Sequence, residues 1–204
     1  MHCKICIFGY NSIMQIAATP CPKRPSGNII LVGMMGAGKT TVGKLLAKQL
    51  SKTFVDCDEE IQRRTGVTIT HIFDFEGEAG FRKRETAVIQ DLVLRNNLIM
   101  ATGGGAVLSG TNRAELSHNG IVIYLKSTVH DLWHRTRHDR NRPLLQTANP
   151  HAQLKELYKQ RDPLYTELAD LIVHSGKQSA QNLVLKLQQE LDLFATSHPI
   201  TCKH

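Results

Sequence analysis

Short apolar runs alternate with longer amphipathic stretches along most of this chain. The largely apolar run Asn28–Val32 lies between two glycines, and an unbroken run of this length is typical of a fully buried strand in a parallel sheet. Similar runs follow at Thr53–Val55, Leu98–Ala101, Ile121–Leu125 and Leu171–Val173.

The stretches between these runs predict helices. In Lys39–Leu50, apolar side chains recur at the spacing that places them on one face of a helix. The full set of predicted helices is Lys39–Leu50, Asp58–Thr65, Ala79–Asn96, Val129–Arg137, His151–Leu168 and Ser179–Leu191. Because strand and helix alternate throughout, we expect an α/β fold with a parallel sheet between layers of helices.

The two ends of the chain differ from the rest. Residues 1–26 contain three prolines close together and three of the cysteines, so we expect an extended or disordered N-terminal extension. Its Cys3-x-x-Cys6 pair lacks a second pair at zinc-ligand spacing, and Met14 is an alternative start. Residues 27–191 show no repeat and no composition shift, which predicts a single domain, and we expect residues 192–204 to form a C-terminal tail.

Composition narrows the class of protein. The chain has 204 residues, of which 41% are hydrophobic and 21% charged, values that exclude a fibrous or wholly disordered protein. No apolar run approaches the ~20 residues of a transmembrane helix, so we expect no membrane partner. Five cysteines do not suggest a disulfide framework, which favours a cytoplasmic location. The net charge of +7 favours anionic partners.

The segment Gly33–Thr40 matches the phosphate-loop pattern G-x-x-x-x-G-K-[ST] between a predicted strand and a predicted helix. In such a loop, the backbone around Gly36, Ala37 and Gly38 turns its amides towards phosphate oxygens. Lys39 supplies a positive charge, Thr40 a hydroxyl for magnesium and Thr41 a further hydroxyl near the α-phosphate. The alternative is a glycine-rich turn with a solvated lysine. We expect the chain to bind a nucleoside triphosphate.

Two aspartates follow the second predicted strand. Asp56 and Asp58 can point into one cleft from different depths, with one near magnesium and the other near a hydroxyl-bearing acceptor. The alternative for Asp58 is a simple helix N-cap. Cys57, between them, is interpreted as a small buried residue, with a reactive thiol as the alternative.

Further charged and glycine-rich segments occur in the second half of the chain. Arg82 and Glu85 have the i,i+3 spacing at which an acid can orient a guanidinium, or they form an ordinary charged helix face. Gly103–Gly105 follows a strand, where backbone can approach a ligand closely, or it is a flexible turn.

The most basic segment, His134–Arg142, is suited to a lid over a triphosphate, with a solvated loop or a nucleic-acid patch as alternatives. Later, Pro163 predicts a helix that kinks or ends, which could aim Arg161 inward; a surface arginine is the alternative.

Taken together, these segments resemble the shikimate kinase family of P-loop kinases, related in fold to the nucleoside monophosphate kinases. The motifs G-x-x-G-A-G-K-T-T, D-x-D, F-R-x-x-E, G-G-G, R-P-L-L and R-x-P-L-Y occur in this order over about Gly27–Leu191. The resemblance implies a three-layer fold whose five-stranded parallel sheet has the order 2-3-1-4-5, with a lid and a substrate-binding helical region. It also implies phosphorylation of the 3-hydroxyl of shikimate by ATP with Mg²⁺, a step of chorismate and aromatic amino acid biosynthesis.

The resemblance implies roles for individual residues. Asp58 matches the family's catalytic aspartate, which hydrogen-bonds the substrate hydroxyls as a base or an orienting group, and Asp56 matches the aspartate that holds magnesium through water. The shikimate-binding positions correspond to Arg82, Gly104 and Arg161, with Glu85 steadying Arg82.

Two further residues match family positions at the nucleotide. Arg142 matches the catalytic lid arginine that reaches the ATP phosphates, and Gln178 matches a residue near the adenine. The family expectation is a monomer.

Two other functions compete with this one. A kinase for another polyol or acid, such as gluconate, would share the phosphate loop but should lack the combination of Arg82, Gly103–Gly105 and Arg161. A nucleotide- or RNA-binding module that has kept the fold would show salt-dependent RNA binding without phosphoryl transfer. The intact set Lys39, Thr40, Asp56 and Asp58 favours an enzyme with no nucleic-acid partner.

Overall fold

We analysed a computed structural model of the chain, which describes residues 27–139, 143–176 and 178–197. The predicted extension 1–26, the lid residue Arg142 and the last part of the predicted tail lie outside the described residues.

The centre of the molecule is a five-stranded parallel sheet with the order β2-β3-β1-β4-β5, which confirms the predicted fold class and strand order. The strands are β1 Asn28–Val32, β2 Thr53–Asp56, β3 Leu98–Ala101, β4 Gly120–Lys126 and β5 Leu171–His174. The central strands β1 and β3 are buried along their whole length, and so is β4 except at its last residue. This burial is the reason that they appear in the sequence as nearly continuous apolar runs.

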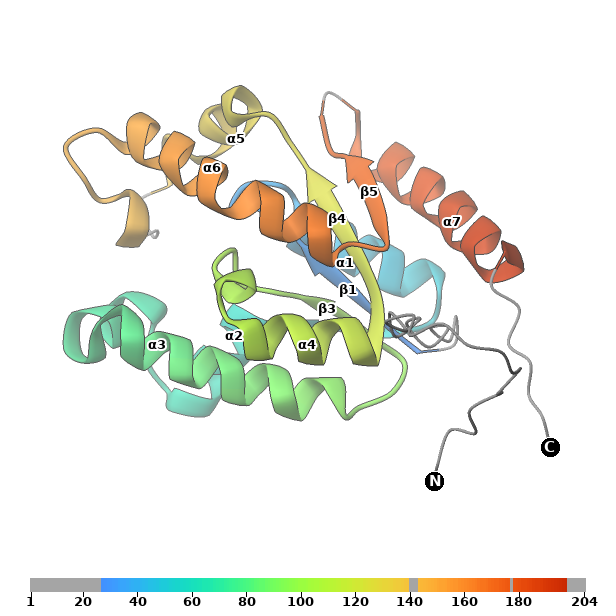
Figure 1. The fold of residues 1–204 in the computed structure, drawn as a ribbon, viewed down its shortest axis with the longest axis horizontal. Helices are drawn as coiled ribbons and strands as arrows, with labels where there is room; N and C mark the ends of the chain where they lie inside the picture. Colours follow the sequence, from blue (N-terminus) through green and yellow to red (C-terminus); the bar gives the residue numbers. More distant parts are fainter. Residues whose placement is uncertain (1–26, 140–142, 177, 198–204) are drawn as a thin grey trace, which may run out of the picture.

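Helices cover both faces of the sheet. Their bounds are α1 Lys39–Gln49, α2 Cys57–Thr65, α3 Ile69–Val93, α4 Gly110–Asn119, α5 Val129–Thr136, α6 Pro150–Leu168 and α7 Ala180–Ser197, with short 3-10 turns at Ala106–Leu108 and Pro143–Leu145. In Figure 1, α4 and α6 cross in front of the sheet, whereas α1 lies behind it and contacts α7. None of the helices in the described part of the chain combines the length and apolar character of a transmembrane helix.

Three helices differ from the sequence prediction. The predicted helix Ala79–Asn96 is the second half of α3, which begins at Ile69 and is interrupted at Gly77, where φ is 67°. Helix α4 was not predicted, because its polar sequence shows little helical periodicity. Helix α7 continues beyond Leu191 to Ser197, and Phe194 packs against the core.

Helix α6 confirms the helix predicted over His151–Leu168, and the alternative that a helix ends at Pro163 is wrong, because α6 continues to Leu168. Proline removes one intrahelical hydrogen bond, so packing and side-chain contacts from outside the helix must hold this turn in place.

Asn28 links the start of β1 to the segment between α3 and β3. Its side chain is 3% exposed, and its Nδ2 donates to the carbonyls of Val93 and Arg95 at 3.3 and 2.7 Å. Its Oδ1 accepts the Leu98 amide at 3.0 Å. The side chain therefore satisfies backbone groups that would otherwise be buried without partners.

We predict that Asn28→Ala lowers the free energy of unfolding by about 2 kcal/mol, since it leaves these buried backbone groups unpaired. Urea unfolding would measure the change, with the exposed Asn96→Ala as a matched control. Equal stability of the two variants would show that the Asn28 contacts contribute nothing.

Candidate active site

The loop between β1 and α1 has the backbone conformation of a phosphate-binding loop. Gly36 and Gly38 have φ of 80° and 95°, values that favour glycine. Gly38 caps α1 without any side-chain hydrogen bond to the first amides of the helix, so these amides are free of a competing cap at the helix N-terminus. Within the loop Ala37 is buried, and Thr41 is exposed on the first turn of α1.

Lys39 folds back over this loop. Its Nζ donates to the carbonyl oxygens of Gly33 and Met34 at 2.8 and 3.0 Å. The ammonium group therefore lies against the loop that would surround the phosphates, where it can exchange carbonyl oxygens for phosphate oxygens.

Arg135 ties the same loop to the segment after β5. Its Nη1 donates to the Gly36 carbonyl at 3.2 Å, and its Nη2 donates to the carbonyls of Ser175 and Gly176 at 2.7 and 2.8 Å. Arg135 was predicted to belong to a lid segment, and its hydrogen bonds to these carbonyls were not predicted. The segment after β5 lies beside the phosphate loop only in the folded chain. Gln178 lies in the same region, exposed, and donates to the His174 carbonyl at 2.9 Å.

Thr40 and Asp56 form a hydroxyl–carboxylate pair beside the phosphate loop. The Thr40 hydroxyl donates to Oδ2 of Asp56 at 2.7 Å. Oδ1 of Asp56 accepts the amide of Asp58 at 3.0 Å and caps α2. The N-cap is therefore Asp56, and the alternative that Asp58 caps the helix is wrong.

This pair fits a magnesium ion. Hard oxygen donors, one or two carboxylates and the phosphates of a substrate are the ligands that Mg²⁺ prefers. Within the described residues, no group of three or more His, Cys, Asp and Glu side chains forms a metal site, so Thr40 and Asp56 are the donors that the protein offers next to the phosphate loop.

A cavity of about 610 Å³ opens beside this loop. It is lined by α2, both halves of α3, the segment Gly103–Gly105, the short 3-10 turn that begins at Pro143, Arg161 of α6 and one residue of the phosphate loop, Met35. The predicted residues Asp58, Arg82, Gly104 and Arg161 all line it. Six further lining residues were not predicted from the sequence: Gln62, Thr68, Ile69, Thr70, Phe73 and Asp139. Four of them, Thr68 to Phe73, lie at or in the first half of α3, which was not predicted as a helix.

Arg82 is held between two carboxylates. Its Nη1 donates to Oε2 of Glu85 at 2.8 Å and its Nη2 to Oε1 of Glu78 at 2.8 Å. Glu85 is 0% exposed, and burial raises the pKa of its carboxyl group, although the positive charge of Arg82 opposes the shift. The predicted i,i+3 contact is therefore present, and it fixes the orientation of a cation at the cavity wall.

Arg161 is the largest side chain buried in the core, with 1% of its surface exposed. Its Nε and Nη1 have no hydrogen-bond partner among the described residues, and burial lowers the pKa of its guanidinium group. A buried guanidinium with unpaired donors is costly unless an anion completes its contacts. The surface-arginine alternative is wrong, and the cavity provides a site for an anionic ligand group.

The glycines of Gly103–Gly105 allow these charged side chains to come close. A Cβ at residue 105 would lie 2.1 Å from Nη2 of Arg82, and one at residue 103 would lie 2.4 Å from Oε1 of Glu85. A Cβ at residue 104 would lie 3.4 Å from the Met35 amide nitrogen and 3.6 Å from Nη1 of Arg161. Gly104 therefore lies where the phosphate loop and the cavity adjoin.

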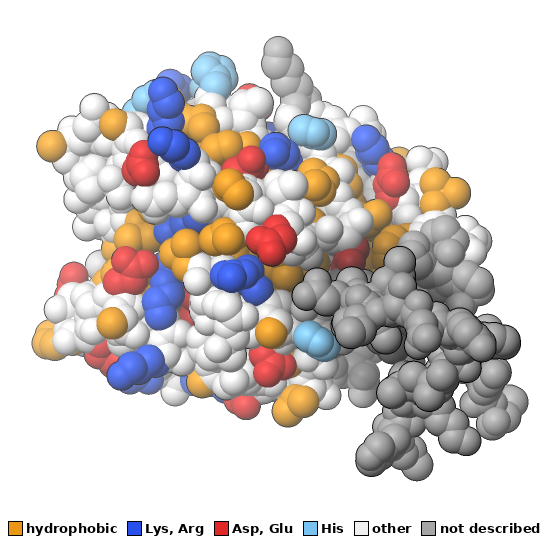
Figure 2. All heavy atoms as spheres, viewed as in Figure 1, with side chains coloured by type: hydrophobic (Ala, Val, Ile, Leu, Met, Phe, Trp, Pro, Cys, Tyr) orange, Lys and Arg blue, Asp and Glu red, His pale blue; other side chains and the backbone are white. Residues whose placement is uncertain are grey.

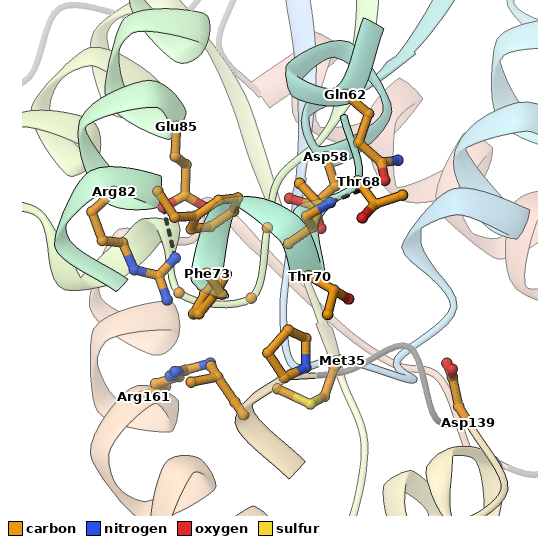
Figure 3. Close-up of a pocket in the computed structure, with 17 residues that line it drawn as sticks. Met35, Asp58, Gln62, Thr68, Thr70, Phe73, Arg82, Glu85, Asp139 and Arg161 are labelled. Atoms are coloured by element: carbon orange, nitrogen blue, oxygen red, sulfur yellow. Dashed lines mark hydrogen bonds and ion pairs between the residues drawn. The ribbon is translucent and has the colours of Figure 1, made fainter. Parts of the chain in front are cut away.

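The cavity has two chemically different ends. In Figure 3, Arg82 and Arg161 lie on one side, Asp58 lies on the other and Asp139 lies near the rim. Guanidinium groups bind carboxylates, whereas a carboxylate accepts hydrogen bonds from hydroxyl groups. The geometry fits a small molecule with a carboxylate at one end and a hydroxyl group near the phosphate loop at the other.

The net positive charge does not concentrate on the face shown in Figure 2. Lysine and arginine side chains there are interspersed with aspartates and glutamates. A continuous basic surface, which nucleic-acid binding favours, is not present on this face.

Cys57, between the two aspartates, is fully buried and is a free thiol. Burial and the neighbouring carboxylates, Asp58 foremost, raise the pKa of its thiol well above its ordinary value. A thiol in this environment stays protonated and inert, which favours the buried-residue interpretation over a reactive thiol.

We predict that Cys57 remains unmodified when the native protein is treated with N-ethylmaleimide at pH 8 and is modified after unfolding. Peptide mapping by mass spectrometry separates Cys57 from the other cysteines. Native modification at the rate of an exposed thiol would contradict the buried environment.

Known proteins resemble this chain over most of its length. A family model described as shikimate kinase matches residues 35–192. A shikimate kinase from Nitrosospira multiformis is 61% identical over 168 residues, covering 82% of this chain and 86% of the relative. A shikimate kinase from Nitrosomonas europaea is 58% identical over 189 residues, covering 90% of each chain.

Solved structures agree with this match. The structure of shikimate kinase from Acinetobacter baumannii in complex with shikimate has a TM-score of 0.81 and 48% identity, covering 85% of this chain and 96% of that one. A gluconokinase from Sinorhizobium meliloti has a TM-score of 0.53 at 17% identity, covering 86% of this chain and 97% of that one. The second similarity shows a shared fold alone.

Proposed function

The chain belongs to the shikimate kinase family, and from this membership we propose how its own residues transfer a phosphoryl group from ATP to shikimate. The single observation that carries the assignment of roles is the two-ended cavity next to the phosphate loop. At one end of it Arg161 is buried, with its Nε and Nη1 lacking a partner among the described residues.

We assign the triphosphate of ATP to the loop from Gly36 to Thr41. The amides at the uncapped start of α1 and the Nζ of Lys39 would contact its phosphate oxygens. The Thr40 hydroxyl and the Asp56 carboxylate would hold Mg²⁺. When bound, the ion neutralises phosphate charge and orients the phosphoryl group. Gln178 is assigned to the adenine region and Arg142 to the phosphates, both from the family motifs.

Shikimate is a carboxylate with three hydroxyl groups, and we assign its carboxylate to Arg82 and Arg161. Arg82 is already oriented by Glu85, and the free donors of Arg161 would be satisfied by the bound carboxylate. Gly104 lets the ligand lie against backbone between Arg161 and the phosphate loop. This arrangement would hold the ring with its hydroxyl groups towards Asp58.

The 3-hydroxyl oxygen of shikimate forms a bond to the γ-phosphorus as the bond to the bridging oxygen of ADP breaks. We assign the hydroxyl proton to Asp58, which faces the cavity from the first turn of α2. Lys39 and Arg142 would neutralise the charge that develops on the transferred group. Asp139, Pro143 and Leu144 line the cavity, and a closer approach of these described residues to a bound substrate would exclude water.

We further propose that residues 27–191 contain the complete catalytic unit and that the enzyme acts as a monomer in the cytoplasm, where ATP is abundant. All of the assigned side chains come from one chain, and Asp58, Arg82 and Arg161 line one cavity beside the phosphate loop.

A coupled assay of ADP release tests the function directly. With ATP and Mg²⁺, we expect release that depends on shikimate and is absent with gluconate. Nucleotide binding without a response to shikimate would contradict the function, and RNA binding with a steep salt dependence and no transfer would favour a binding module instead.

We predict that Lys39→Met lowers kcat at least about 100-fold, because it removes a positive charge from the phosphate loop. Circular dichroism and thermal unfolding should show a fold like that of the wild type. Near-normal turnover would mean that Lys39 does not act on the transferred phosphate.

We predict that Asp56→Asn and Asp58→Asn, a matched pair two positions apart, change different kinetic quantities. Asp56→Asn should raise the Mg²⁺ concentration needed for half-maximal activity and lose less activity at saturating Mg²⁺. Asp58→Asn should lower kcat by about 100- to 10,000-fold at any Mg²⁺ concentration. Magnesium titrations that give the same profile for both variants would contradict this division of roles.

A further inference from the structure

A polar network beneath α6 involves the residue next to Arg161. Oδ1 of Asp162 accepts the Tyr124 hydroxyl at 2.6 Å, and Oδ2 accepts Nζ of Lys126 at 3.1 Å. Tyr124 and Lys126 belong to β4, so the network fastens α6 to the sheet. Although burial opposes it, hydrogen bonds from Tyr124 and Lys126 keep the pKa of Asp162 below its ordinary value, and the group is an anion.

The contacts of Asp162 with β4 lie at the turn of α6 that contains Pro163. Pro163 cannot donate to the carbonyl of Lys159, so the helix lacks one of its own hydrogen bonds there. Consecutive residues of a helix lie about 100° apart around its axis. Asp162 can therefore face β4 while Arg161 faces the cavity.

The network also separates two opposite charges that are adjacent in the sequence. No ion pair joins Asp162 to Arg161 among the described residues, and Asp162 instead pairs with Lys126 at 3.0 Å. Arg161 keeps unpaired donors on Nε and Nη1. The carboxylate nearest to Arg161 in the chain is thus held on another side of the helix.

Aromatic packing extends the anchor towards the phosphate loop. The rings of Tyr124 and Tyr165 lie 4.9 Å apart, and the Tyr165 hydroxyl donates to the Gly104 carbonyl. A Cβ at residue 33 would lie 3.5 Å from the Tyr124 ring. Tyr124 therefore lies close to the first glycine of the phosphate loop and also bonds to the turn that carries Arg161.

We propose that Asp162, held by Tyr124 and Lys126, is a positioning residue for the acceptor: it fixes the turn of α6 that directs Arg161 into the cavity and leaves that guanidinium available for a carboxylate. This role rests on the proposed function of Arg161. Asp162 acts through Arg161 and does not contact the acceptor.

Steady-state kinetics of Asp162→Asn and Tyr124→Phe test the role. Both variants keep the shape of the side chain and remove the charge or the hydroxyl. We expect the KM for shikimate to rise about five- to twentyfold, while kcat and the KM for ATP change less than about twofold.

Asp170→Asn is the matched control. Oδ2 of Asp170 accepts the Val122 amide at 2.8 Å, so Asp170 also joins the α6–β5 segment to β4. It lies beyond the end of α6, nine positions after Arg161. We expect this variant to lose stability without a selective change in the KM for shikimate. An equal rise in that KM for Asp170→Asn would reduce Asp162 to a general stabilising contact and overturn the proposal.

A double substitution separates positioning from stability. In an Arg161→Lys background, Asp162→Asn should change the KM for shikimate less than about twofold, because the group that it positions is already altered. A full independent effect in that background would overturn the proposal. If Asp162→Asn does not fold, Tyr124→Phe, which retains the ring stacking, decides by the same criteria. Absence of shikimate-dependent activity in the wild type would instead overturn the proposed function itself.

Discussion

A guanidinium group that is removed from water needs negative charge close to it, and Arg161 has donors that no described residue satisfies. Many features of the fold serve to keep this cation in place. The anchor of Asp162 on β4 holds its turn of helix, and Tyr165 bonds to the Gly104 carbonyl beside it. Arg82, with its charge already balanced by Glu85, completes a rigid cationic wall. In the proposed function, a bound carboxylate recovers the free energy spent on burying Arg161.

The parallel sheet explains why the two substrates meet. The carboxyl ends of parallel strands share one edge, and the phosphate loop follows β1, the D-x-D segment follows β2 and the glycine triplet follows β3. Because the sheet order places β3 between β1 and β2, Gly104 comes to lie between the phosphate loop and Arg161. Residues that are far apart in the sequence thereby form one site with a cation at one end and Asp58 at the other.

The sequence predicted those parts of the molecule that are determined by residues close together in the chain. The phosphate loop, the buried central strands and the contact of Arg82 with Glu85 depend on neighbouring residues, and the structure confirms all of them. Helix α4 was missed because its polar sequence is stabilised by packing against α3. The alternative that a helix ends at Pro163 was wrong because contacts from β4 outweigh the lost hydrogen bond. The bridging role of Arg135 was missed because it depends on distant carbonyls.

The central claim is that paired guanidinium groups recognise the carboxylate of shikimate while its hydroxyl groups face Asp58. The most direct test compares kcat/KM for shikimate and for its methyl ester, which keeps every hydroxyl group, loses the negative charge and adds one methyl group. The account predicts a value at least about 100-fold lower for the ester, with the KM for ATP unchanged, since charged hydrogen bonds to Arg82 and Arg161 are lost. Comparable values for acid and ester would contradict it, because the buried cation would then have no role in choosing the acceptor.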